Sequence, residues 1–138
     1  MPTATDVAGG TLPVFNRPYD WSVKHTPAVN TVATISKAAV ATQRHVCTGF
    51  TASVASDGAV SVANLVVVLR DGATGAGTIV QASSLSVITT AGSSANIVIS
   101  GLNIIGTLNT AMTVEFLAAG GANTYENVSM MGYSVTPG

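Results

Sequence analysis

The sequence predicts an all-β protein: an antiparallel β-sandwich or jelly roll of about seven or eight short strands with an extended N-terminal arm. Residues 29–136 contain no proline, so every residue there can donate a hydrogen bond to a strand ladder. Apolar and polar residues alternate through much of this stretch, which is the pattern of half-buried strands. Clusters of Gly, Asn, Asp and Ser separate the alternating runs at short intervals, as in sandwiches and jelly rolls.

Residues 1–28 are predicted to form the arm, and residues 29–138 the sandwich. Four of the five prolines lie in the first 28 residues, and prolines at this density favour extended chain and disfavour helix. Phe15, Tyr19 and Trp21 lie between these prolines. We expect these three aromatic side chains to bind a neighbouring subunit or a partner surface. The alternatives are an arm that folds back onto its own domain and an arm that is disordered.

The first strands of the sandwich are predicted from their alternation. Residues 29–36 alternate with a period of two, and residues 46–54 do the same before Ser56-Asp57-Gly58. Asp-Gly between two such runs predicts a hairpin turn. Residues 32–43 are rich in Ala, and one turn of helix is conceivable there, but no long helix is expected.

A central strand and its hairpin are predicted next. Residues 60–70 contain Leu65-Val66-Val67-Val68-Leu69, and a continuous apolar run of this length indicates a strand covered on both faces. Residues 71–77 are predicted to form a mobile hairpin tip. Glycines and asparagines predict turns at 101–111. Further strands are expected at residues 78–88, 96–100, 112–117 and 126–135.

Charge is scarce, and this limits the possible functions. Charged residues make up 8% of the chain, against about 25% in an average protein. The net charge of −1 provides no basic surface for nucleic acid. A surface so poor in charge is easier to understand if much of it is buried in an oligomer or lattice.

The apolar runs of the sequence bear on membrane association and on cellular location. No apolar run reaches the roughly 18 residues of a membrane span, so we expect no membrane association. The first residues show neither the basic nor the apolar region of a secretory signal. We therefore expect the protein to be made in a cytoplasm and used there or released by lysis.

The few reactive residues do not form a recognisable site. His25 and His45 lack partners at metal-ligand spacing, and the single cysteine, Cys47, is expected to be a buried small hydrophobe. Two carboxylates are enough for a glycosidase, but the spacing of Glu115 and Glu126 does not favour such a pair. The sequence thus predicts a protein that is not an enzyme and has no cofactor or metal.

The loop 71–77 resembles a phosphate or calcium loop only superficially. A phosphate-binding loop needs a lysine before Ser or Thr at the start of a helix, and this loop has none. A calcium loop needs several carboxylates, and this loop has only Asp71.

Three segments carry a resemblance to a known class of proteins: Arg44–Thr48, Val68–Thr78 and Leu102–Phe116. They resemble small virion structural proteins of tailed bacteriophages, which are β-sandwich decoration (cement) or minor capsid proteins. The resemblance covers about residues 29–135 and leaves the arm unmatched. It implies a non-enzymatic role, a homo-oligomer that is most simply a trimer, and binding to the major capsid protein on the virion surface after synthesis in the host cytoplasm. The family offers no catalytic residues to carry over.

Other functions remain open at this point. A head-fibre, tail or spike component with receptor or carbohydrate binding is the main alternative. A cellular carbohydrate-binding sandwich and an enzyme are the others. A carbohydrate-binding face usually presents exposed aromatic side chains, and the predicted sandwich contains few.

Overall fold

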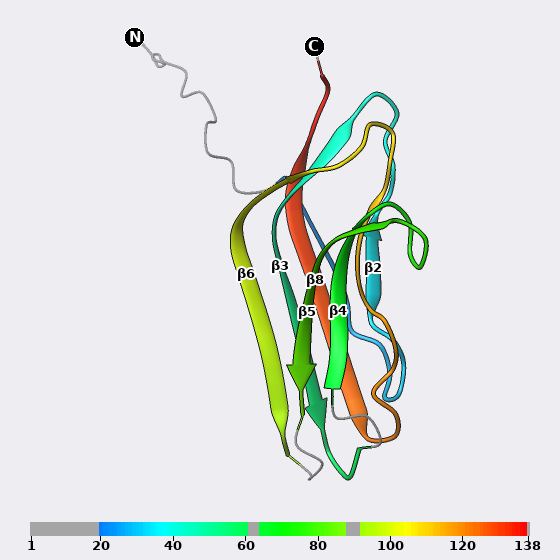
Figure 1. Cartoon of the computed structure of the whole chain (residues 1–138), viewed down its shortest axis with the longest axis vertical. Helices are drawn as coiled ribbons and strands as arrows, with labels where there is room; N and C mark the ends of the chain where they lie inside the picture. The colour runs from blue at the N-terminus through cyan, green and yellow to red at the C-terminus, as the bar shows by residue number, and fades with distance from the viewer. Residues whose placement is uncertain (1–19, 61–63, 88–91, 138) are drawn as a thin grey trace.

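The computed structural model describes residues 20–60, 64–87 and 92–137. Within these residues eight strands form two antiparallel four-stranded sheets, and no helix occurs (Figure 1). The prediction of an all-β protein is therefore confirmed. The strands are β1 (Trp21–His25), β2 (Thr34–Lys37), β3 (Arg44–Ser56), β4 (Asn64–Asp71), β5 (Thr78–Ser86), β6 (Ser94–Ile105), β7 (Met112–Phe116) and β8 (Thr124–Val135).

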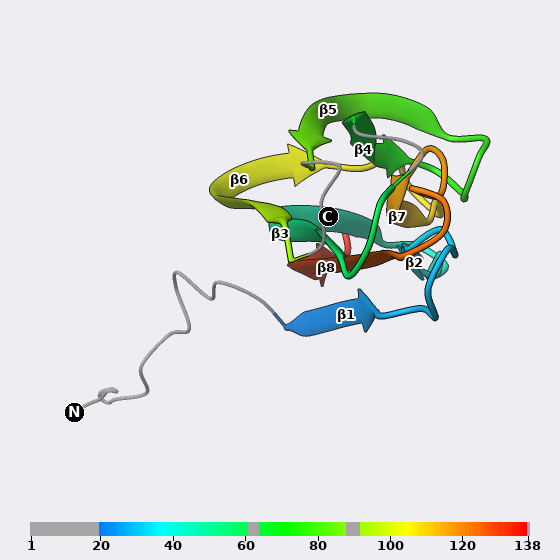
Figure 2. The ribbon, with the colours of Figure 1, turned by 90° about the horizontal axis from the view of Figure 1, so that it is seen from below.

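The two sheets face each other as two layers. Sheet I has the order β1-β8-β3-β6, and sheet II has the order β2-β7-β4-β5 (Figure 2). The antiparallel pairs are nested: β1 pairs with β8, β2 with β7, β3 with β6, and β4 with β5. The pairs thus nest outward from the connection between β4 and β5.

The core lies between the layers because the alternation of the strands directs their apolar side chains inward. Phe50 and Val54 point inward from β3, and Val114 and Phe116 point inward from β7; all four are at most 1% exposed. Removing such apolar surface from water contributes about 25 cal/mol per Å². Burial between the sheets is therefore the main source of stability.

The predicted central strand is confirmed. β4 lies between β7 and β5 in sheet II. Leu65, Val67 and Leu69 belong to the core, while Val68, whose side chain faces the other way, is also fully buried. The continuous apolar run therefore reflects cover on both faces.

The hairpin predicted at Asp57-Gly58 is wrong. These residues follow β3 in sheet I and lead toward β4 in sheet II, so they connect the two layers. The Asp57 N–H donates to the Asn123 carbonyl, 3.1 Å away, in the connection between β7 and β8. An Asp-Gly pair favours a local reversal of the chain, but it does not decide which sheet the next strand joins. The hairpin predicted at 71–77 does connect paired strands, β4 and β5.

Two other boundaries differ from the prediction. Sheet I begins at Trp21, so the boundary predicted after residue 28 falls after the first strand. β6 continues through Gly101 to Ile105, where turns were predicted. Gly101 has a φ of 71°, and the pairing of β6 with β3 shifts register beside it. A glycine in this conformation can produce an irregularity in a ladder without reversing the chain.

Candidate functional site

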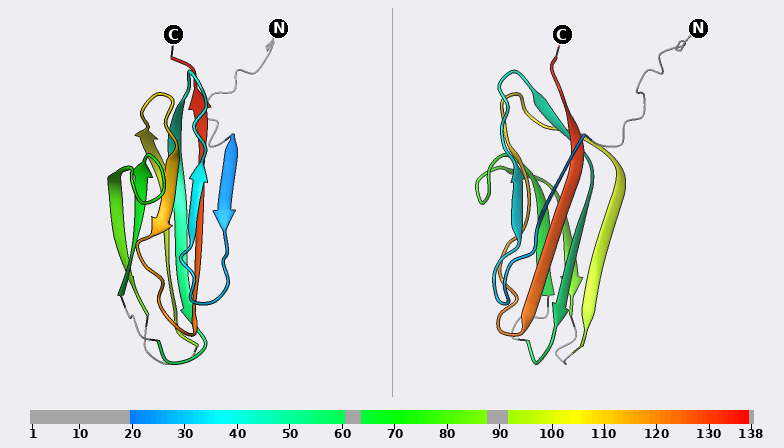
Figure 3. Two further views of the ribbon diagram at one scale, coloured as in Figure 1. Left: turned by 90° about the vertical axis from the view of Figure 1, so that its right-hand side faces the viewer. Right: turned by 180° about the vertical axis from the view of Figure 1, so that it is seen from behind.

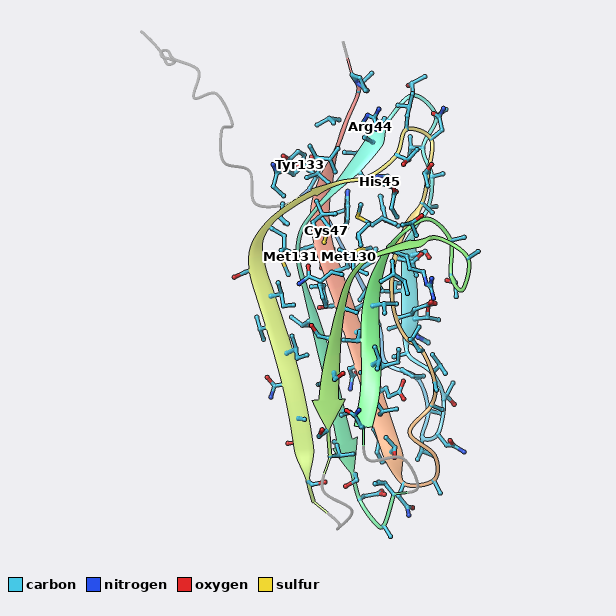
Figure 4. All side chains as sticks on the ribbon, viewed as in Figure 1. Arg44, His45, Cys47, Met130, Met131 and Tyr133 are labelled. Atoms are coloured by element: carbon cyan, nitrogen blue, oxygen red, sulfur yellow. The ribbon has the colours of Figure 1, made fainter. Side chains whose placement is uncertain are left out.

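A directed chain of hydrogen bonds joins three strands at one end of sheet I. The Trp21 Nε1–H donates to the Ser134 hydroxyl at 3.1 Å, and that hydroxyl lies 2.8 Å from His45 Nδ1. His45 Nε2 lies 2.7 Å from the Ala38 carbonyl. Because a carbonyl can only accept, Nε2 carries a proton, and in the neutral imidazole Nδ1 accepts from the Ser134 hydroxyl. Figure 4 shows His45 near this end of β3, with Tyr133 on the neighbouring β8.

The Trp21 ring closes the same end of the sandwich. It packs over Gly132, its partner residue on β8, so closely that a Cβ atom at Gly132 would lie 2.8 Å from the ring. It meets the His45 ring edge to face, with centroids 5.8 Å apart, and Lys37 Nζ lies 5.7 Å from the Trp21 centroid. Trp21 is thus engaged within its own domain.

The structure places the three predicted partner-binding residues differently. Trp21 is the first residue of β1, whereas Phe15 and Tyr19 lie outside the described residues. That all three bind a partner stays a prediction. For Trp21, any such role has to coexist with its contacts to Gly132, His45 and Ser134.

An ion pair anchors the loop between β4 and β5 to the outer face of sheet II. Arg70 Nε lies 2.6 Å from Glu115 Oε2, and the same oxygen accepts from the Gly75 N–H at 3.2 Å. Arg70 Nη1 donates to the Gly77 carbonyl at 2.8 Å. Thr113 Oγ1 donates to the Gly72 carbonyl at 2.8 Å. The loop predicted to be a mobile tip is therefore held at both of its ends and in its middle.

A second carboxylate, Glu126, is buried and accepts hydrogen bonds from two backbone N–H groups. One oxygen accepts from the Ala33 N–H at 2.9 Å, and the other accepts from the Gly120 N–H at 3.0 Å. Its side chain faces the core from β8, and the residue is 1% exposed. Burial raises the pKa of Glu126, and the two backbone donors oppose that rise. Glu126 ties the segments before β2 and before β8 to the end of the sandwich.

The two glutamates do not share a site. Glu115 bonds to groups on the outer face of sheet II, and Glu126 bonds to backbone groups between the layers. His25 Nδ1 accepts from the Thr34 N–H at 3.2 Å. In the part of the chain that the structure describes, no three His, Cys, Asp or Glu residues are grouped so that they could hold a metal ion. These ionisable groups serve the connections between strands.

The two open sides of the sandwich differ sharply, and this difference is the candidate functional feature. β1 and β2 are the edge strands on one side (Figure 3, left), and β5 and β6 are the edge strands on the other. β1 and β2 have five and four residues, and they carry Lys24 and Lys37. β5 and β6 have nine and twelve residues and contain neither a charged residue nor a proline. Short strands and lysines protect an edge from pairing with another chain, and the β5/β6 side lacks both devices.

Comparisons with known proteins add no identification. A scan against protein-family models and a search of the curated proteins both give no match. Among the described residues, no helix has the length and apolar character that a bilayer crossing requires.

Proposed function

We propose that this protein is a non-enzymatic virion structural protein: a jelly-roll decoration protein that binds the major capsid protein of a tailed-phage head as a homo-oligomer. The observation that carries the proposal is the nested strand pairing. The orders β1-β8-β3-β6 and β2-β7-β4-β5 support a jelly roll, because an eight-stranded antiparallel hairpin rolled into two sheets would have these orders. Jelly rolls of this kind occur in viral capsid domains, and also in lectins and cupins.

The use of charge supports assembly over catalysis. Arg70 and Glu115 neutralise each other, and Glu126 is buried against backbone donors. Asp71 accepts from the Thr107 backbone and hydroxyl, and Asp57 accepts from Tyr125. Each of these charged groups is thus bonded within the subunit, although Asp57 stays exposed at its surface. Protein interfaces are depleted in charge at their centres, so a surface of this kind suits extended contact with other subunits.

The N-terminal residues are the proposed anchor to the shell. Trp21 fixes the start of β1 on its own sandwich, and Phe15 and Tyr19 precede it by a few residues. In this proposal Phe15 and Tyr19 contact the capsid, and Trp21 holds the base of the arm. The proposed oligomer is a trimer, and the proposed location is the outer surface of the capsid.

The proposal is tested by co-sedimentation of the purified protein with tailed-phage heads that lack it. We expect saturable binding at a fixed ratio to the major capsid protein. Deletion of residues 1–19 should remove binding while leaving the oligomer intact. A glycan array serves as the contrasting assay, because lectins share the jelly-roll arrangement. Glycan binding together with no binding to heads would replace this proposal with the receptor-binding alternative.

A further inference from the structure

We propose that the β5/β6 side of the sandwich is the surface through which copies of this chain join, edge strand to edge strand. The occupant of this side is a second copy of the same chain. The inference adds to the proposed oligomer the surface through which its subunits bind. It rests on the proposed function only for the number of subunits. It derives from the shape and chemistry of two edge strands, not from the resemblance to capsid proteins.

The first argument is that the inner surface of β6 is apolar but incompletely covered. Ala95, Ile97, Ile99, Leu102 and Ile104 face the core, and each is only partly buried. On the opposite edge strand, Gln81 and Ser83 pair with the core residues Leu69 and Val67 and so face inward as well. They too are half-buried. The core is therefore left partly open along this side, and another subunit placed there would complete its burial.

The second argument is the regular stretch of backbone that β6 presents. Ser94–Ser100 pairs with β3 in unbroken register, from Ala55↔Ser94 to Gly49↔Ser100. The other edge of the same stretch has no neighbouring strand among the described residues. Val98, near its middle, is 71% exposed. A strand added here would satisfy the backbone groups of an uncharged edge, as in β-augmentation.

Charge favours a second copy over a different partner. An identical β5/β6 side brings no charged side chain into the contact, because neither strand contains one. No charge would then be buried without a counter-ion, which is the usual cost of a mismatched edge. The β1/β2 side would place Lys24 and Lys37 in the contact and is excluded on the same ground.

The strand directions allow a closed ring. β5 ends and β6 begins at the same end of the sandwich, so the two strands run in opposite directions (Figure 1). Rotation about an axis parallel to the strands preserves their directions. β5 of one copy can therefore pair antiparallel with β6 of the next around a three-fold axis. A two-fold axis perpendicular to the sheets would instead pair β6 with β6 and β5 with β5.

The main test introduces a charge on each side of the sandwich and measures the mass of the full chain in solution by light scattering. Ile99→Lys places an ammonium group on the inner face of β6. In an isolated subunit this group can reach water through the half-open β5/β6 side, and a second subunit bound there would block that path. Val23→Lys is the matched control, because Val23 is also a half-buried, inward-facing residue of an edge strand, on the β1/β2 side. We expect Ile99→Lys to weaken association about 100-fold or more, as for a charge buried without a partner. We expect Val23→Lys to leave the mass unchanged.

A cross-linking experiment keeps the inference testable if Ile99→Lys does not fold. Val98→Cys and Ala82→Cys in one chain place thiols on the outer faces of sheet I and sheet II, at exposed positions of β6 and β5. A short bismaleimide should then join subunits into a ladder. Ser22→Cys with Ser36→Cys, on the outer faces of β1 and β2, should not form one.

The outcomes separate this inference from the proposed function. A folded Ile99→Lys variant of unchanged mass, equal cross-linking at both pairs, or a monomeric wild-type protein would overturn the β5/β6 contact. If the wild-type protein is a dimer and Ile99→Lys dissociates it, the β5/β6 contact is supported and only the proposed trimer is overturned. Failure to bind phage heads with the edge contact intact overturns the capsid function alone.

Discussion

Arg70 and Glu115 form an ion pair, with Nε and Oε2 2.6 Å apart, on the outer face of sheet II under the loop that joins β4 to β5. Their side chains are 12% and 5% exposed. The guanidinium also holds the Gly77 carbonyl, and the carboxylate also holds the Gly75 N–H. The pair therefore connects two strands and positions a loop.

We expect Arg70→Met to lower the free energy of unfolding by about 3 kcal/mol, because it leaves the covered Glu115 carboxylate without its cation. Denaturant unfolding followed by circular dichroism measures this loss. The double variant Arg70→Met/Glu115→Met should lose less than the sum of the two single variants, since it removes both charges. A loss below about 1 kcal/mol for Arg70→Met would place the pair with ordinary surface ion pairs.

Trp21→Ala should lower the free energy of unfolding by about 2–4 kcal/mol, because it uncovers Gly132 and removes the packing against His45. Trp21→Phe keeps most of this packing and loses the hydrogen bond to Ser134, so about 1 kcal/mol is expected. Deletion of residues 1–19 should leave the melting temperature unchanged, because β1 begins at Trp21. If Trp21→Ala leaves the free energy of unfolding unchanged, Trp21 does not stabilise its own domain and can bind a partner as Phe15 and Tyr19 are predicted to do.

Glu126 should make stability depend on pH in the direction opposite to an ordinary carboxylate. Its pKa in the folded protein is raised above the ordinary 4.5 because of burial. The folded state therefore binds the proton more tightly than the unfolded state, and the contribution of Glu126 is fully present below 4.5 and is lost as pH rises through the folded pKa. Melting temperatures of the wild type and Glu126→Gln, measured from pH 4 to 8, give this contribution by difference. We expect the wild type to gain on the variant as pH falls, and a constant difference would contradict the shift.

Cys47 should resist thiol reagents in the folded protein. It is fully buried, and burial raises its pKa to about 11, so almost no thiolate forms at pH 8. We expect labelling by iodoacetamide to follow global unfolding, with full reaction in denaturant. Val98→Cys, an exposed position, supplies the reactive control. Rapid labelling of wild-type Cys47 would indicate local opening of β3.

The elements of the fold could be predicted because each strand carries its own signal. The inward residues Phe50, Ala52 and Val54 of β3 and the apolar run of β4 follow from alternation and length, and both appear where they were expected. Val46 and Thr48 were expected inward as well, but the register shift between Cys47 and Gly49 places Cys47 in the core instead. The sheet that each successive strand joins was harder to predict from the sequence. The turn at Asp57-Gly58 depends on Asn123, which lies far along the sequence, so no local pattern determines that it crosses between layers.

The polar contacts were harder to predict than the strands. The sequence predicts a strand at residues 112–117 with Glu115 in its middle. The ion pair of Glu115 with Arg70 and its burial under residues 72–77 form only because β4 and β7 are neighbours. Ser134 gave no signal, because hydroxyl residues are abundant and only one of them meets both Trp21 and His45. Even so, the contrast between edge strands was present in the sequence, as the absence of charge from residues 78–86 and 94–105.

The nested pairing determines when this fold can be completed during synthesis. β8, the last of these eight strands to be synthesised, lies between β1 and β3 in sheet I. Until it emerges, β1 has no strand to pair with, and β3 pairs only with β6. Folding that depends on contacts so distant in sequence is slow, on the order of milliseconds to seconds. Until β8 is in place, the nascent chain therefore presents the uncharged edges of β5 and β6 beside an incomplete sheet I.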